Sequence, residues 1–92
     1  EVTAVYAHGT GTPKGDLAEI RALNEVFRDR IENLLVTSLK GHMGHPGSCA
    51  AAMNLVAATI GMHRGEVLPT ASTKNVDPEV QFDLVLERPR QV

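Results

Sequence analysis

The sequence predicts an α/β fold in which helices join the strands of a largely parallel sheet. Three short segments of strand composition, residues 2–7, 34–38 and 80–86, alternate with two longer helical patterns. This strand-helix-strand-helix-strand order is typical of right-handed crossovers between parallel strands. The first two strand segments each lead into a glycine-rich stretch that contains histidine. Because the carboxyl ends of parallel strands lie at one edge of a sheet, we expect both stretches there.

The first strand and helix are predicted from the amino-terminal third. Residues 2–7 are mostly apolar and end at His8, after which residues 9–15 form a loop. Asp16 can cap the following helix, with Glu19 three residues later as in a capping box. The apolar positions expected on the buried face of this helix are Leu17, Ile20, Leu23, Phe27 and Ile31.

The second helix is predicted to be buried on several sides. Residues 34–38 form the second strand, and residues 40–47 form a loop with three glycines and two histidines. The helix begins near Ser48 and ends at Gly65. It is apolar around most of its circumference, so we interpret Cys49 as a packing residue. In the last strand, alternation predicts one buried face, formed by Val80, Phe82, Leu84 and Leu86.

Composition argues against several classes of function. The net charge is −2 and 3% of the 92 residues are aromatic, with no lysine or arginine run, so nucleic acid is not an expected partner. A single cysteine excludes an internal disulfide and no secretory leader is evident, which favours a reducing, cytoplasmic setting. The longest apolar stretch, residues 49–62, is shorter than the roughly 20 residues that span a bilayer.

The two histidine loops predict an oxyanion-stabilising site. A neutral imidazole donates one N–H, so His8 and His45 together can stabilise the negative charge that develops on one carbonyl oxygen. His45 precedes the apolar helix, whose positive end disfavours an imidazolium, and Lys40 acts in the same direction. We therefore expect His45 to act as a neutral hydrogen-bond donor.

Motifs in a fixed order along the chain resemble the second half of the β-ketoacyl synthases, the condensing enzymes of fatty acid and polyketide assembly. They are His8-Gly9-Thr10-Gly11-Thr12-Pro13, then Gly15-Asp16 and Glu19, then Ser38-Leu39-Lys40, and finally Gly44-His45. The similarity extends from about residue 2 through Leu68-Pro69 and fades toward Val92. A pentapeptide alone is moderate evidence, whereas its combination with a later lysine and Gly-His pair is strong.

This resemblance implies a thiolase-like fold and a decarboxylative Claisen condensation. An acyl thioester would react with malonyl carrier protein in a Cys-His-His site, where His8 and His45 are the catalytic histidines and Lys40 lies beside them. Thr10 and Thr12 match positions that bind the phosphopantetheine arm of the acyl carrier protein. The acidic positions near the lysine are Asp16 and Glu19. The family implies a homodimer or heterodimer, with no metal and no cofactor of its own.

The same resemblance implies that residues 1–92 are a fragment of the C-terminal ketosynthase domain. The family's nucleophilic cysteine lies far upstream, and its closing glycine-rich strand is not found in this sequence. Cys49 follows His45 and is therefore not matched to the nucleophile, and Asn54 stands where fatty acid synthases of this family commonly have glutamate. We expect the chain alone to be inactive.

Other functions are compatible with parts of the pattern. A non-catalytic partner subunit, similar to a chain-length factor, would bind carrier protein without condensation, although it would need neither histidine. His42 and His45, with His63 and Cys49, suggest zinc, but Pro46 and Gly47 interrupt the helix that would align the pair. The glycine-threonine loop lacks the Gly-Lys-Ser/Thr ending of a nucleotide-binding P-loop.

Overall fold

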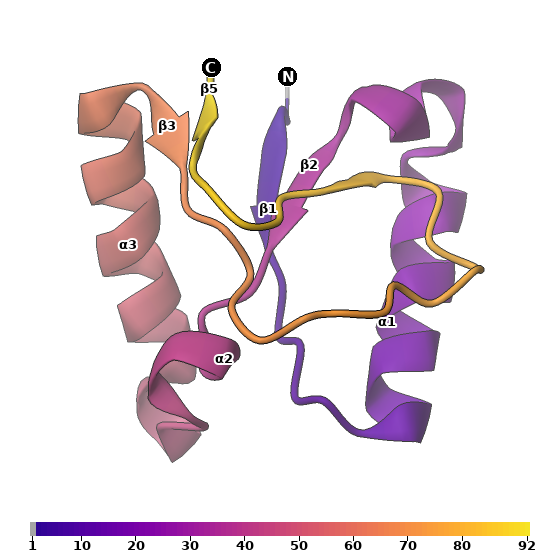
Figure 1. The fold of residues 1–92 in the computed structure, drawn as a ribbon, viewed down its shortest axis with the longest axis horizontal. Helices are drawn as coiled ribbons and strands as arrows, with labels where there is room; N and C mark the ends of the chain where they lie inside the picture. The colour runs from indigo at the N-terminus through magenta and orange to yellow at the C-terminus, as the bar shows by residue number, and fades with distance from the viewer. Residues whose placement is uncertain (1) are drawn as a thin grey trace.

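Three parallel strands form the central sheet of the computed structural model, which describes residues 2–92. Strand β1 (Ala4–Tyr6) pairs with β2 (Leu35–Thr37), and β2 pairs with β4 (Asp83–Leu84). Helices α1 and α3 lie on opposite sides of β1 and β2 (Figure 1). The predicted parallel α/β arrangement is confirmed.

A second, antiparallel pair of strands was not predicted. Strand β3 (Glu66–Val67) follows α3 directly and pairs with β5 (Arg90–Gln91) near the carboxyl terminus. Each strand has two residues, which is too short for alternation to be visible in the sequence. The pairing brings the end of the chain back against the end of α3 (Figure 1).

Helix α1 (Pro13–Val26) begins earlier than the sequence predicts. Thr12 is the N-cap, and its hydroxyl oxygen accepts the Gly15 N–H. Proline at the first helical position lacks the N–H that would be unpaired there, and threonine is a strong cap, so together they start the helix before Asp16. The predicted cap at Asp16 is therefore wrong. Its carboxylate instead accepts the Gly11 N–H at 3.1 Å.

Short helical turns separate the sheet from both long helices. A 3₁₀ segment, η1 (Arg28–Asn33), follows α1. After β2, residues predicted as loop form the single turn α2 (Lys40–Met43), and η2 (Gly47–Cys49) leads into α3 (Ala50–Arg64). Helix α3 ends at Gly65 in the left-handed conformation, as predicted.

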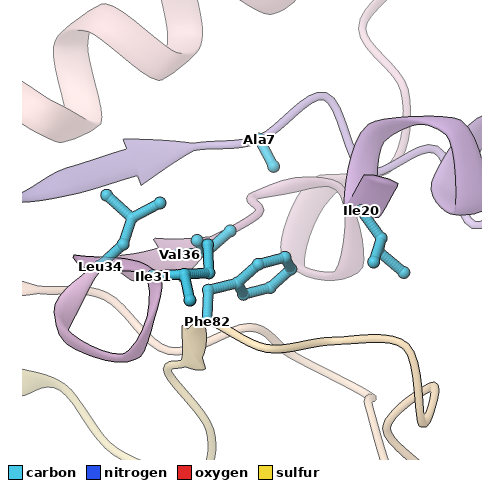
Figure 2. Close-up of a cluster of buried hydrophobic side chains, with 6 residues drawn as sticks. All are labelled: Ala7, Ile20, Ile31, Leu34, Val36 and Phe82. Atoms are coloured by element: carbon cyan, nitrogen blue, oxygen red, sulfur yellow. The ribbon is translucent and has the colours of Figure 1, made fainter. Parts of the chain in front are cut away.

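The hydrophobic core lies between the sheet and the α1–η1 side. Figure 2 shows its buried members, which are Ala7, Ile20, Ile31, Leu34, Val36 and Phe82. The last strand is not buried on one face only, because Val85 is completely buried while Leu84 and Leu86 are half-buried. The predicted alternation is thus wrong, since structure covers both faces of a sheet of this class.

Helix α3 is much more exposed than its composition predicts. Its large apolar side chains reach 69% exposure at Leu55 and 82% at Met62, and Cys49 is also exposed. Gly61 is its buried residue, lying against the Glu66 carbonyl and the Tyr6 hydroxyl. The predicted burial on several sides is wrong here because the described residues cover only the side facing β1 and β3. Composition indicates how much surface a helix can bury, and neighbours decide how much it does bury.

Candidate active site

His8 and His45 lie side by side at the carboxyl edge of the sheet. His8 follows β1 by two residues, and His45 follows the α2 turn after β2. Their ring centroids are 5.4 Å apart and the rings are nearly perpendicular, at 88°. Both side chains are exposed among the described residues. The two imidazoles can therefore reach one small group, as the sequence predicts, whereas their catalytic role remains a prediction.

Lys40 holds His8 rather than His45. Its ammonium nitrogen lies 2.6 Å from the His8 carbonyl oxygen and 3.3 Å from His8 Nδ1. A lysine ammonium group only donates hydrogen bonds, so His8 Nδ1 must accept. The ring proton of a neutral His8 then resides on Nε2. The expectation that Lys40 acts on His45 is not matched by a contact, since its partners are both on His8.

The ring of His45 is held in the same tautomer by the backbone. The Gly47 N–H lies 3.0 Å from His45 Nδ1, and a backbone N–H can only donate. The neutral His45 ring therefore also carries its proton on Nε2. Two independent contacts thus leave both imidazoles as Nε2–H donors, the arrangement suited to a shared acceptor oxygen.

Glu19 supports the loop that carries His8. Its two carboxylate oxygens accept the N–H groups of His8, at 2.7 Å, and Gly9, at 2.9 Å. Gly9 has φ +48, and a Cβ there would lie 2.4 Å from Ser38 Oγ, so only glycine fits. The sequence placed Glu19 in a capping box or near the lysine. The supporting contact was missed because no local pattern links Glu19 to backbone groups ten and eleven residues away.

Thr10 and Thr12 use their hydroxyls within the loop. The two oxygens are 3.0 Å apart, and Thr12 also caps α1. Both nevertheless line an open groove with a cavity volume of about 510 Å³, so contact with a ligand arm remains a prediction. Ile20, Val36 and Phe82 contribute to its apolar lining.

This groove is adjacent to the histidine pair but does not contain it. Lys40 lines the groove and also contacts His8, whereas neither imidazole is among the lining residues. The histidine pair is the candidate catalytic centre, because oxyanion stabilisation depends on converging donors rather than on cavity volume. The groove is also lined by residues 70–73, 75–77 and 80.

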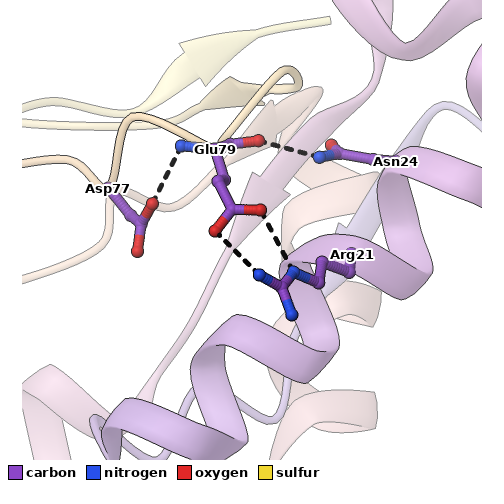
Figure 3. Close-up of polar contacts among 4 residues, drawn as sticks. All are labelled: Arg21, Asn24, Asp77 and Glu79. Atoms are coloured by element: carbon purple, nitrogen blue, oxygen red, sulfur yellow. Dashed lines mark hydrogen bonds and ion pairs between the residues drawn. The ribbon is translucent and has the colours of Figure 1, made fainter.

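A polar clamp fastens this lining segment to α1. Figure 3 shows Glu79 bound through both carboxylate oxygens to Arg21, at 3.1 and 3.3 Å, while Asn24 donates to the Glu79 carbonyl oxygen. The Asp77 carboxylate accepts the Glu79 N–H, which folds the segment into a turn. The hydrogen bond that Arg21 donates to the Glu79 carboxylate raises the pKa of Arg21.

The residues considered as zinc ligands do not converge. His42 Nε2 lies 2.7 Å from the Pro69 carbonyl oxygen. Within residues 2–92, no group of three or more histidine, cysteine or acidic side chains is placed to hold a metal ion.

Within the same described residues, no helix is long and apolar enough to cross a membrane. Asn54 donates to the Tyr6 carbonyl oxygen at 3.4 Å.

Comparison with a family model decides the relationship. Residues 1–74 match the model described as beta-ketoacyl synthase, C-terminal domain. The chain belongs to this family. Its three-stranded parallel sheet and flanking helices are accordingly part of a thiolase-like ketosynthase fold.

Relatives by sequence include a 3-oxoacyl-acyl-carrier-protein synthase and a polyketide synthase. A chloroplastic 3-oxoacyl-acyl-carrier-protein synthase I of Hordeum vulgare is 37% identical over 91 residues, covering 99% of this chain and 20% of that protein. A highly reducing polyketide synthase of Penicillium roqueforti is 33% identical over 84 residues, covering 90% of this chain and 4% of that protein.

The solved structures show the same fold with high similarity. The ishigamide ketosynthase/chain length factor superposes with a TM-score of 0.90 at 28% identity, covering 99% of this chain and 22% of that one. A type II polyketide ketosynthase in complex with its acyl-carrier protein and bound to the hexaketide also gives 0.90, at 27% identity, covering 98% and 22%. The chain therefore spans about a fifth of these ketosynthase chains.

Proposed function

We propose that this ketosynthase segment supplies the two histidines of a decarboxylative Claisen condensation between an acyl thioester and malonyl carrier protein. The observation that supports it is the convergence of two imidazoles, 5.4 Å apart, each with Nδ1 engaged as an acceptor. In that state both rings present an Nε2–H donor. Removing one donor from an oxyanion-stabilising pair typically lowers the rate by about 10²–10³.

The proposed chemistry begins with the malonyl thioester oxygen between the two Nε2–H groups of His8 and His45. The bond to the free carboxylate breaks, carbon dioxide leaves, and the electron pair moves into the enolate, whose oxygen carries the charge. The enolate carbon then attacks an acyl group held as a thioester on a cysteine supplied from outside these 92 residues. Collapse of the tetrahedral intermediate expels the cysteine thiolate and forms the β-ketoacyl product.

The remaining site residues are proposed to position the substrate and the loop. Lys40 and Glu19 fix the His8 segment through the contacts described above. Thr10 and Thr12 line the groove and carry hydroxyls suited to the amide-rich phosphopantetheine arm. Asp16 supports the same loop through Gly11.

We extend the proposal to the whole protein. Its partners are the remainder of the ketosynthase and an acyl carrier protein, which a solved relative binds. Its own assembly is a homodimer or heterodimer, it uses no cofactor of its own, and its setting is cytoplasmic. The proposal covers fatty acid and polyketide assembly alike, since relatives of both kinds match.

The test is a pair of histidine substitutions in the intact synthase. His8→Ala and His45→Ala should each lower release of labelled carbon dioxide from malonyl carrier protein by about 10²–10³. His42→Ala is the matched control, because His42 is exposed and contacts the Pro69 carbonyl instead of the pair. Unchanged decarboxylation in both site variants would refute the proposal. Binding of carrier protein without decarboxylation or condensation in the unsubstituted protein would instead indicate the non-catalytic partner subunit.

A further inference from the structure

The chain between β3 and β4 is fixed near its start by contacts with the sheet and with α2. The Thr70 N–H donates to the Val85 carbonyl oxygen at 2.8 Å. A Cβ added at Gly41 would lie 2.4 Å from the Ala71 carbonyl oxygen, so α2 packs directly against the chain there. Among the described residues, 72–76, which we call the strap, make no hydrogen bond to α1, α2 or the sheet. The position of the strap therefore depends on how the chain is held on either side of it.

The strap is held at its other end by the clamp on α1. Arg21 donates twice to the Glu79 carboxylate, at 3.1 and 3.3 Å, and Asn24 donates to the Glu79 carbonyl oxygen at 2.8 Å. Arg21 and Asn24 are three residues apart, so both lie on the same side of the helix (Figure 3). Figure 1 shows the chain after β3 crossing to α1 and turning back there. The clamp thus fixes the point at which the chain turns.

The strap contributes to the lining of the groove described above. Four of its five residues line the groove, namely Ser72, Thr73, Asn75 and Val76. Ser72 has φ +64, a conformation that costs a serine free energy and persists only where the surrounding chain imposes it. The strap is therefore held in this arrangement by its two ends rather than by its own conformational preference.

Acidic groups in the groove are already engaged by the protein. The Asp16 and Glu19 carboxylates accept backbone N–H groups of residues 8–11, and the Asp77 carboxylate accepts a backbone N–H of the clamp. The groups left to a ligand are mainly hydroxyls, the Asn75 amide and apolar side chains. Such a lining suits a neutral, extended chain that carries amides, which is the chemistry of pantetheine.

We propose that Arg21 is a positioning residue that keeps the strap in place and so strengthens the binding of the pantetheine arm in the groove. The identity of the arm rests on the proposed function. Arg21 does not itself line the groove, so its effect is transmitted through Glu79 to the strap. The apparent dissociation constant of the arm rises as the share of molecules with the strap in place falls.

Reversal of charge tests the clamp in both directions. Arg21→Glu would place a carboxylate beside those of Glu79 and Asp77, which both act on Arg21, and the repulsion would displace the chain from α1. Because the ion pair is exposed, we expect binding to weaken only roughly fivefold. Glu79→Arg should act in the same direction, and the double variant Arg21→Glu with Glu79→Arg restores attraction. Arg28→Glu is the matched control, since Arg28 pairs with Glu25 and neither residue lines the groove.

The experiment uses the intact synthase with two probes. The dissociation constant of free pantetheine, a neutral molecule, should rise roughly fivefold in Arg21→Glu and recover in the double variant. With malonyl carrier protein, KM should rise by a similar factor while kcat stays constant, because the clamp does not touch the reacting groups. Hydrogen exchange at the amides of the strap should increase in both single variants and return to its original rate in the double variant.

Several outcomes would overturn the proposal. They are the absence of pantetheine binding to the unsubstituted protein, equal affinities in Arg21→Glu and Arg28→Glu, no recovery in the double variant, and a fall in kcat at constant KM. Failure of the proposed function has a different signature, because decarboxylation would then be indifferent to His8→Ala and His45→Ala. Pantetheine affinity and exchange of the strap need no turnover, so they would still follow the charge-reversal series.

Discussion

The contact between Glu19 and the His8 loop predicts a specific loss on changing the carboxylate to an amide. Each Glu19 oxygen accepts one backbone N–H, at 2.7 Å from His8 and 2.9 Å from Gly9. Glu19→Gln retains the shape but offers one acceptor oxygen, and its NH₂ group faces the second N–H donor. One of the two hydrogen bonds is therefore lost.

The magnitude follows from the cost of a hydrogen bond to a charged acceptor. Such bonds contribute about 1.5–3 kcal/mol, and the low end applies because His8 is exposed and Glu19 is partly exposed. We expect the free energy of unfolding to fall by about 1.5 kcal/mol, which for a domain of this size lowers Tm by roughly 6–12 °C. If the loop opens locally instead, its exchange rates rise about tenfold.

The assay combines urea denaturation with amide hydrogen exchange of the chain. The amides of His8 and Gly9 should lose protection selectively, because they are the two donors to Glu19. Glu25→Gln is the control, since Glu25 is on the same helix and pairs with Arg28 at the exposed surface. Exchange at His8 and Gly9 that is identical in the Glu19→Gln and Glu25→Gln variants, together with equal stability, would refute the role of Glu19.

Three further predictions concern the same loop, the clamp and the chain as a whole. Gly9→Ala should destabilise the fold by about 1–3 kcal/mol in thermal unfolding, because residue 9 has a positive φ and the added Cβ would lie 2.4 Å from Ser38 Oγ. Gly11→Ala should destabilise the fold less, because a Cβ added at residue 11 meets no atom within 4 Å. Arg21→Ala should leave the thermal stability nearly unchanged, since the Glu79 pair is exposed, yet increase exchange at the Glu79 amide. The purified 92-residue chain should show thiol-ester exchange at background level, and measurable acyl transfer would contradict our interpretation of the chain as a fragment.

Several parts of the fold and site could be predicted because their causes are local. Gly65 ends α3 because glycine accepts the left-handed conformation at a helix end, and this holds wherever the helix packs. The placement of His8 and His45 follows from two strand-to-loop boundaries and the rule that parallel strands share a carboxyl edge. Thr12-Pro13 starts α1 for an equally local reason, because threonine caps the helix and proline suits its first position.

Partner choice could not be predicted in the same way. Glu19, a helix residue, binds loop amides, and Lys40 binds the histidine that is 32 residues away rather than the one five residues ahead. Such choices depend on which donors and acceptors the packed chain brings within about 3 Å, and sequence spacing does not contain that information. The burial of Val85 and the exposure of Leu55 have the same origin, because burial is a property of neighbours.

The sequence by itself therefore determined the class of fold, the two histidine loops and the family to which they belong. Tertiary structure decided the tautomers of the two rings, the target of each carboxylate and the surface left open on α3. The physical reason is range: caps, turns and periodicity act over a few residues, whereas a hydrogen bond across the fold exists only after the strands have paired.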